Sequence, residues 1–228
     1  MSTMEPTVRA GSGAMFDRIA GRYDLLNRLM SLGLDQRWRR QLVDATTKSA
    51  PAGELLDLAT GTGDVAILAA RSKGRTVVGL DPSAQMLAEA KEKIGPLAIS
   101  LTQGDAEKLP FEGARFAAVT MSFGIRNVAD RPRALAEMAR VLVPGGRVGI
   151  LELGEPNSAI ARFHVHNIVP RLGAWLSNDA EYAYLARSIA AFPPPDEFAA
   201  TMRAAGFVDV EARPLSFGAL HLYTGTKR

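Results

Sequence analysis

The sequence has 228 residues, of which 47% are hydrophobic and 22% are charged. This balance is typical of a soluble globular domain and excludes a disordered, collagen-like or coiled-coil chain. Cysteine is absent, which excludes a disulfide framework, a thiolate metal site and a cysteine nucleophile. No apolar run reaches the roughly 18 residues of a membrane span, and the first residues lack the apolar segment of a secretory signal. A cytoplasmic protein is therefore expected.

The net charge of +3 comes from the N-terminal part of the chain. Residues 1–50 hold eight basic and five acidic side chains, whereas the remainder is balanced. The excess includes Arg37-Trp-Arg-Arg40, a cluster that could contact nucleic acid or an anionic membrane surface. The alternative is a solvated helix face, which so small an excess favours.

The N-terminal quarter predicts a tail followed by two helices. Residues 1–13 lack periodicity and are expected to form a flexible tail. Over residues 14–50 apolar side chains recur at helical spacing, and the second helix is expected over about residues 36–47.

Residues 51–155 alternate between short apolar strands and helices, and a further helix and two strands follow residue 193. The predicted strands are 54–59, 76–81, 97–102, 116–122, 147–153, 206–211 and 219–227. The predicted helices are 64–71, 84–93 with Ser83 as its N-cap, 133–142 and a last one ending at Ala205. This pattern predicts an α/β fold, a seven-stranded and mostly parallel sheet with helices on both faces.

Residues 156–192 interrupt the strand pattern with aromatic and aliphatic side chains at helical spacing. They predict a helical insertion, which is either a small packed subdomain or an apolar lid over a substrate. The chain is expected to be a single domain over residues 1–228. Its parts are a tail (1–13), N-terminal helices (14–50), a ligand-binding core (51–155), the insertion (156–192) and a C-terminal helix and strand pair (193–228).

The first chemical motif is Asp57-Leu-Ala-Thr-Gly-Thr-Gly-Asp-Val-Ala66, where a predicted strand enters a glycine-rich turn and then a helix. Gly61 permits a tight turn, and Gly63 lets a ligand approach the backbone. The N–H groups at the helix start can bind an anionic group. This motif alone fits a dinucleotide site, a methyl-donor site or a turn without a ligand.

An acidic residue ends the next predicted strand. Asp81 lies 20 positions after Gly61, where a carboxylate can accept hydrogen bonds from two ribose hydroxyls. The alternative is an ordinary helix-capping aspartate. The spacing favours the ribose role but does not separate NAD from S-adenosylmethionine.

The segments that follow distinguish a site for S-adenosylmethionine from a site for NAD. Gly104-Asp105-Ala106-Glu107 follows the third strand, Met121-Ser122-Phe123-Gly124 ends the fourth, and Leu142-Val-Pro-Gly-Gly-Arg-Val148 leads into the fifth. Together with Asp57 and Asp81 they resemble, in order and over about 100 residues, the motifs of class I S-adenosylmethionine-dependent methyltransferases. Because the sulfonium donor is cationic and has no pyrophosphate, an acidic, hydroxyl-lined cleft suits it.

A narrower resemblance covers residues 15–228. Phe16-Asp-Arg-Ile-Ala-Gly-Arg-Tyr-Asp24, Ser122-Phe-Gly-Ile-Arg-Asn-Val128 and Pro170-Arg-Leu-Gly-Ala-Trp-Leu-Ser-Asn-Asp179 are similar to segments of the quinone-biosynthesis C-methyltransferases. That family methylates demethylmenaquinol or the ubiquinol precursor. Ala59, where many methyltransferases carry glycine, departs from the wider class and is compatible with this family.

The resemblance implies a role for each matching residue. The cofactor S-adenosylmethionine would contact Asp57, Gly61, Thr62, Gly63, Asp81, Asp105, Ala106 and Ser122. The catalytic residues would be Arg126, Asn127 and Tyr23. Phe163, Trp175, Asn178, Tyr182 and His221 would belong to a lid over the substrate. Arg126 would stabilise a phenolate or position a water, and Asp105 would face the adenine. Tyr23 would close the donor pocket or pack on the core.

The implied partner is a prenylated quinol, with no nucleic acid and no metal. Its isoprenoid tail lies in the bilayer, which favours transient peripheral contact with the inner face of the membrane. A homodimer stays open. Competing functions are methylation of RNA or of another small phenol, donor binding without catalysis and, least favoured, a nicotinamide oxidoreductase.

Overall fold

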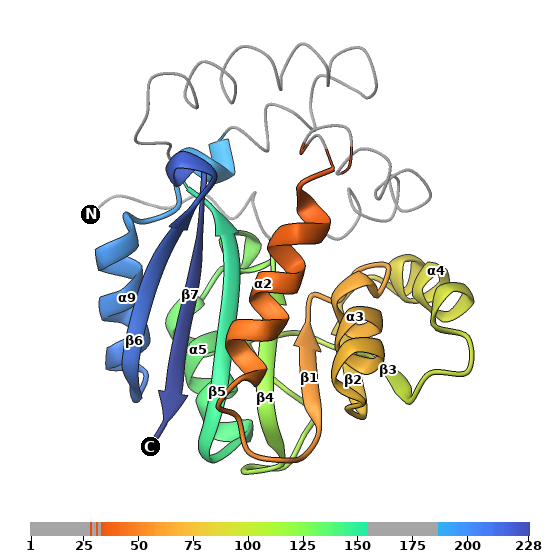
Figure 1. Cartoon of the computed structure of the whole chain (residues 1–228). Helices are drawn as coiled ribbons and strands as arrows, with labels where there is room; N and C mark the ends of the chain where they lie inside the picture. The colour runs from red at the N-terminus through yellow and green to blue at the C-terminus, as the bar shows by residue number, and fades with distance from the viewer. Residues whose placement is uncertain (1–27, 29–30, 32, 155–186) are drawn as a thin grey trace.

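The computed structural model describes residues 28, 31, 33–154 and 187–228. These residues form a seven-stranded sheet with helices on both faces (Figure 1). The strand order is β3-β2-β1-β4-β5-β7-β6, and the first five strands are parallel while β7 runs antiparallel to both neighbours. The predicted fold class is therefore confirmed. The tail, the first predicted helix and most of the predicted insertion lie outside the described residues.

The described elements follow the predicted ones closely. The strands are β1 (Leu55–Leu58), β2 (Val77–Asp81), β3 (Ile99–Gln103), β4 (Phe116–Ser122), β5 (Leu142–Leu153), β6 (Phe207–Leu215) and β7 (Leu220–Lys227). The helices are α2 (Asp35–Thr47), α3 (Asp64–Lys73), α4 (Ala84–Ile94), α5 (Arg131–Val141) and α9 (Pro195–Ala204), and the 3-10 turns are η2 (Ile125–Asn127) and η4 (Ser216–Gly218).

Local capping explains where two of the helices begin. The Ser83 hydroxyl accepts a hydrogen bond of 3.0 Å from the Met86 N–H, as expected of an N-cap at the start of α4. Helix α5 begins two residues earlier than predicted. The Asp130 carboxylate caps it by accepting from the Arg133 N–H at 3.0 Å, and a proline occupies its first turn.

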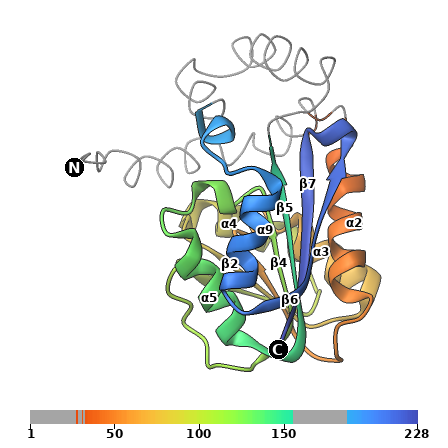
Figure 2. The same ribbon diagram turned by 90° about the vertical axis from the view of Figure 1, so that its left-hand side faces the viewer.

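The sheet separates two apolar layers. Helices α5 and α9 cover one face and α2 and α3 cover the other, and the two views place them on opposite sides (Figures 1 and 2). Every residue of β1 and β2 is buried, which is typical of parallel strands covered on both faces. Two of the predicted strand ends differ. β5 begins at Leu142 and so includes the turn that was predicted to precede it. β6 continues to Leu215 because it stays paired with β7.

Helix α2 lies directly on the backbone of β5. A Cβ atom at Gly149 would clash with the hydroxyl of Thr46, so only glycine permits this approach. The Thr46 hydroxyl donates to the Leu42 carbonyl at 2.7 Å and is held in place. Leu42 and Val43 are buried with side chains of β1, β5 and β7. An element from the start of the chain therefore completes the core of its C-terminal half.

The basic cluster of the N-terminal helix is divided between the core and the surface. Arg37 and Arg40 are exposed, but Arg39 is buried and forms ion pairs with Asp35 at 3.4 Å and with Asp64 at the start of α3. The prediction of one cluster that is solvated or contacts a membrane is wrong for Arg39. Its guanidinium links α2 to α3, because a buried charge is stable only when it is paired.

Among the described residues, no helix combines the length and the hydropathy that crossing a bilayer requires.

Removal of the buried arginine should destabilise the fold. We expect Arg39→Met to lower the free energy of unfolding by about 3 kcal/mol, because it leaves buried carboxylates without their main counter-charge. The matched control is Arg37→Met on the exposed face of the same helix, which should change it by less than about 0.5 kcal/mol. Urea unfolding followed by circular dichroism measures both. Equal stability of the two variants would contradict the structural role of Arg39.

Candidate functional site

The order of the strands predicts a ligand-binding crevice at the carboxyl ends of β1 and β4. The chain passes from β1 outward to β3 and then returns to β4, so the crossover connections diverge between these two neighbours. Ligands of open α/β sheets bind at such a point. The glycine-rich loop of residues 59–63 follows β1 at this edge. Ala59, Gly61 and Gly63 all have positive φ, at 50°, 54° and 84°.

Ala59 has a left-handed backbone conformation, which is energetically less favourable for alanine than for glycine. It ends β1 in the left-handed region, beside the end of β4, where Phe123 also has a positive φ of 58°. A Cβ at Gly124 would lie 2.7 Å from the Ala59 Cβ, so the two strand ends approach each other closely. This explains why a glycine is common at position 59 in the wider class. Gly124 is what allows the alanine here.

Asp57 holds the glycine-rich loop from inside the sheet. Its carboxylate is buried and accepts hydrogen bonds from the hydroxyls of Thr60 at 2.6 Å and Thr120 at 2.8 Å. Burial raises the pKa of Asp57 from 3.8 to about 6, although both hydroxyls oppose this shift. Asp57, which is predicted to contact the ligand, thus also positions the glycine-rich loop by joining it to β1 and β4.

Asp81 contacts the same loop from the end of β2. Its side-chain oxygens accept hydrogen bonds of 2.9 Å from the Gly61 and Ser83 N–H groups. The carboxylate therefore fixes the turn that follows β1 and the start of α4. It lies at the carboxyl end of β2, beside the glycine-rich loop.

A second set of charges surrounds the start of α3. Lys93 donates to the Thr62 hydroxyl at 3.0 Å and to the Asp64 carboxylate at 2.7 Å, and Asp64 also pairs with Arg39. Burial alone would raise the pKa of Asp64, but Arg39 and Lys93 outweigh it and hold this pKa below its usual value. The loop is thus fixed on both sides, by acids from β1 and β2 and by cations from α2 and α4.

The third and fourth strands place the remaining predicted donor contacts. Asp105 is exposed after β3, where its carboxylate accepts from the Glu107 N–H at 2.8 Å, and Ala106 is buried beside it. Ser122 ends β4, and its buried hydroxyl has no hydrogen-bond partner within the described part of the chain. A buried hydroxyl of this kind is rare unless a ligand or water completes its bonds.

The predicted catalytic arginine lies on the other side of the β4 end. Arg126 donates from Nη1 to Glu152 at 2.6 Å and to the Phe123 carbonyl at 2.9 Å. Glu152 is fully buried on β5 and accepts from the Arg126 N–H at 3.1 Å as well. The Arg126 Nε atom is buried, and none of the described residues forms a hydrogen bond with it. Asn127 follows in η2, which brings both predicted catalytic residues of the described chain to this edge.

His221 lies on β7 within the sheet, where the predicted strand 219–227 places it, and not in the helical insertion. It is 4% exposed and lies directly across the ladder from Glu152. Its Nδ1 atom has no hydrogen-bond partner among the described residues. Burial lowers the pKa of His221, and the Asp196 charge opposes this in part. The other predicted site residues, Tyr23, Phe163, Trp175, Asn178 and Tyr182, lie outside the described residues.

The sequence analysis missed the residues that support this site. They are Thr60, Thr120, Glu152, Arg39 and Lys93. Glu152 carried a signal, because it is the one acid inside the apolar strand 147–153 and a buried charge needs a partner. Thr120 and the two cations carried none, since their contacts come from segments far apart in the sequence, whereas Thr60 contacts Asp57 only three residues before it. Among the described residues no group of histidine, aspartate or glutamate could hold a metal.

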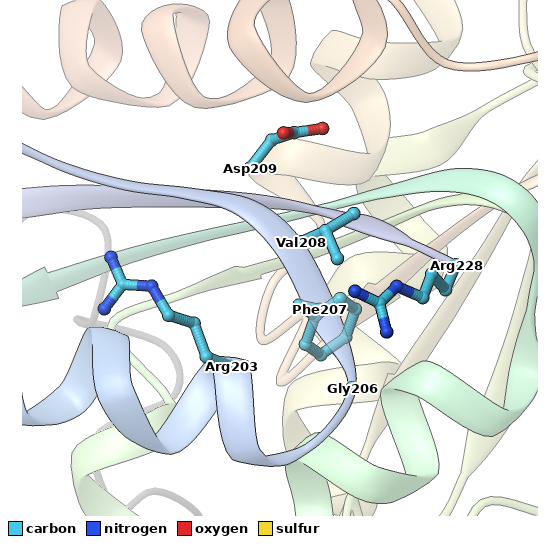
Figure 3. A pocket seen from close by; sticks show the side chains of 6 residues that line it. All are labelled: Arg203, Gly206, Phe207, Val208, Asp209 and Arg228. Atoms are coloured by element: carbon cyan, nitrogen blue, oxygen red, sulfur yellow. The ribbon is translucent and has the colours of Figure 1, made fainter.

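A shallow pocket lies at the opposite edge of the sheet. Figure 3 shows its lining by Arg203, Gly206, Phe207, Val208, Asp209 and Arg228. It lies where β6 begins and β7 ends, away from the carboxyl ends of β1 and β4. None of the predicted site residues lines it, so it is not the candidate site.

The strand order with its antiparallel β7, the loop after β1 and the acid after β2 define a class I S-adenosylmethionine-dependent methyltransferase. The chain belongs to the ubiE/COQ5 methyltransferase family, whose model matches residues 6–227. It is 46% identical to a demethylmenaquinone methyltransferase of Deinococcus radiodurans, with 94% of this chain and 91% of that protein covered. It is 42% identical to a ubiquinone/menaquinone biosynthesis C-methyltransferase UbiE of Geotalea daltonii, with 93% and 94% covered.

Solved structures support the fold. An S-adenosylmethionine-dependent methyltransferase of Thermotoga maritima, described as a possible histamine N-methyltransferase, matches with a TM-score of 0.68 at 21% identity, covering 95% of this chain and 99% of that one. A phosphoethanolamine N-methyltransferase 2 of Haemonchus contortus, solved with S-adenosyl-L-methionine, has a TM-score of 0.65 at 17% identity, with 84% and 52% covered.

The buried Asp57 makes a prediction about pH. Below pH 3.8 its carboxyl is protonated in both the folded and unfolded states; as the pH rises to about 6, only the unfolded chain ionises it. Stability is therefore lost over this interval, and the loss is complete above it. We expect Asp57→Asn to be more stable than wild type at pH 8, by up to about 3 kcal/mol. This advantage should shrink as the pH falls toward 4, as measured by urea unfolding. An advantage independent of pH would contradict the raised pKa.

Proposed function

We propose that this chain methylates a ring carbon of a prenylated quinol, converting demethylmenaquinol to menaquinol or acting on the benzoquinol precursor of ubiquinone. The observation that carries the proposal is the likeness to relatives named demethylmenaquinone methyltransferase, at 46% and 45% identity over 94% and 93% of the chain. The described site supplies groups that suit this chemistry.

The crevice fits the methyl donor. The residues that we propose hold it are Asp57, Gly61, Thr62, Gly63, Asp81, Asp105, Ala106 and Ser122. The fit rests on the orphaned Ser122 hydroxyl and on the loop of positive-φ residues beside the Asp81 carboxylate. An acidic, hydroxyl-lined edge suits a cationic sulfonium compound that carries ribose hydroxyls. When bound, the donor supplies the methyl group as an electrophile.

The acceptor ring requires loss of a phenol proton, because a phenolate pushes charge onto the carbon that is to be methylated. The Arg126 guanidinium lies just after the end of β4, and its Nε–H is a buried donor without a hydrogen-bond partner among the described residues. We propose that this guanidinium stabilises the developing phenolate oxygen. The ion pair with Glu152 fixes the guanidinium in place, so the donor is already oriented when the substrate binds. Asn127 and Tyr23 would complete this side of the site. The lid over the quinol would be formed by Phe163, Trp175, Asn178 and Tyr182.

The test of this function is methyl transfer from labelled S-adenosylmethionine to reduced short-tail demethylmenaquinone and to a reduced benzoquinone precursor. Mass spectrometry identifies the methylated atom. Ring-carbon methylation of either substrate supports the proposal, and the ratio of the two rates identifies the preferred quinol. Methylation only of an RNA or of an oxygen atom of a soluble phenol would overturn it.

Asp81 provides a test of the donor site. We expect Asp81→Asn to raise the dissociation constant for S-adenosylmethionine about 10- to 100-fold, because a charge-assisted hydrogen bond contributes roughly 1.5–3 kcal/mol. The matched control is Glu92→Gln, which removes an exposed carboxylate from the adjacent helix α4 and should change the constant less than twofold. Isothermal titration measures both. Equal binding by the two variants would remove Asp81 from the donor site.

We also propose transient contact with an anionic membrane surface, since the acceptor carries a prenyl tail. The side chains proposed to contact the membrane are the exposed Arg37 of α2 and Phe217 of η4, and the latter is 86% exposed. A hydrogen bond of 3.0 Å from Trp38 Nε1 to the Ser216 hydroxyl joins α2 to this turn. An exposed aromatic ring and an exposed arginine on linked elements are the residue types of an interfacial anchor.

Flotation with vesicles tests this contact. Wild-type protein should float with vesicles that contain anionic lipid at low salt and should be released by about 0.5 M salt, where screening shortens the range of the attraction. Arg37→Glu and Phe217→Ser should each weaken flotation, while Arg203→Glu, at the opposite edge of the sheet, should not. Absence of flotation at low salt would refute the contact.

A further inference from the structure

The segment that carries the proposed catalytic arginine is fixed by an acid at each of its ends. This segment connects β4 to α5 and includes the turn η2. At its first end Glu152 accepts hydrogen bonds from the backbone N–H and the guanidinium of Arg126. At its second end the N–H groups of Ala129 and Asp130 donate to one oxygen of Glu107, at 3.1 and 3.0 Å. The proposed function gives Glu107 no role.

Glu107 is also joined to the residue that is proposed to face the adenine of the methyl donor. Its N–H donates to the Asp105 carboxylate at 2.8 Å, and the Lys108 N–H donates to the Asp105 carbonyl at 3.1 Å. These two bonds form a tight turn after β3, in which Asp105 is exposed. Only Ala106 therefore separates the proposed adenine contact from the residue whose carboxylate holds the start of α5.

The start of α5 in turn holds η2. Arg133, in the first turn of this helix, donates from Nε to the Glu107 carbonyl at 2.8 Å. Arg131 donates to the carbonyls of Ile125 and Arg126, at 3.3 and 3.1 Å. A continuous series of hydrogen bonds thus runs from the turn after β3, through the start of α5, to the backbone of the proposed catalytic arginine.

The hydrogen bonds of Glu107 are exposed to water. Their net contribution to stability is small, because water competes for both partners, and segments that are held in this way open locally at low free-energy cost. A ligand that fixes one end of such a series lowers the entropic cost of ordering the other end. Two sites joined by the series therefore assist each other's binding.

We infer that Glu107 is a positioning residue that couples binding of the methyl donor to ordering of the acceptor side of the site. This inference rests on the proposed function. When Asp105 is held by the donor, the turn that contains Glu107 is fixed. Glu107 then holds the start of α5, and Arg131 holds the backbone of Arg126. The acceptor ring is therefore bound more tightly after the donor than before it, and the acceptor raises the affinity for the donor by the same factor.

Hydrogen exchange followed by NMR tests this coupling without turnover. In the wild type, saturating S-adenosylhomocysteine should slow exchange of the Ala129 and Asp130 N–H groups about tenfold, because Glu107 holds both. Glu107→Ala should lose this added protection, whereas Glu107→Gln, which keeps an acceptor oxygen, should retain most of it. The matched control is Glu137→Gln. The Glu137 carboxylate also joins α5 to the loop after β3, but it does so by accepting from the Leu109 N–H at 2.8 Å, so this variant should behave as wild type.

Isothermal titration measures the coupling itself. The probe for the acceptor is 4-methoxy-1-naphthol, which resembles one half of the quinol ring system. Its dissociation constant for the wild type should fall about five- to tenfold when S-adenosylhomocysteine is saturating. The fall should be less than twofold in Glu107→Ala and unchanged in Glu137→Gln. A merely structural role of Glu107 would weaken the binding of each ligand alone and leave the size of the fall unchanged.

The outcomes separate the two proposals. If the wild type methylates no quinol and does not bind the naphthol, the proposed function fails, while the exchange experiment still decides whether Glu107 links Asp105 to α5. If S-adenosylhomocysteine protects neither N–H group in the wild type, the assignment of Glu107 is overturned. It is also overturned if Glu107→Ala keeps the added protection or keeps the wild-type fall in the dissociation constant.

Discussion

The carboxylate of Asp57 joins three parts of the molecule at one point. It lies in the middle of the sheet and accepts from one hydroxyl in the glycine-rich loop and one on the adjacent strand β4. Without those hydroxyls an acid in this place would be costly, and even with them its pKa is raised to about 6. The raised pKa of Asp57 lowers the stability of the fold at neutral pH. The same carboxylate fixes the glycine-rich loop in its left-handed conformation. That loop is the edge of the proposed donor site.

A second buried acid, on the other face of the sheet, has different hydrogen-bond partners. Glu152 is fully buried and is neutralised by a guanidinium and by main-chain N–H groups rather than by hydroxyls. Asp57 thus fixes the loop at the proposed donor site, and Glu152 orients the cation proposed to meet a developing anion. The two acids lie on the parallel strands β1 and β5, which the central strand β4 separates. Preorganised charge of this kind is the main source of rate enhancement in many enzymes.

The sequence predicted the strands, most of the helices and the place of the glycine-rich loop, because these depend on local signals. Continuous apolar runs indicate buried parallel strands, and Ser83 and the loop glycines have local conformational reasons. The same reasoning failed for Arg39, which looks like a surface residue in an Arg-Trp-Arg-Arg run until Asp64 is brought beside it. For His221 it indicated the strand but not the neighbour, since pairing of β7 with β5 decides what a lone histidine faces. Interactions between distant segments have no local pattern.

The position of α2 has a consequence for biosynthesis. Its buried face packs on β4, β5 and β7, whose residues are made much later than the helix itself. Until β7 emerges from the ribosome, Leu42 and Val43 have only part of their packing surface, and both apolar layers lack the side chains of β7. The order of synthesis therefore delays closure of the core until β7 has been made, and the nascent chain exposes apolar surface of the kind that chaperones bind.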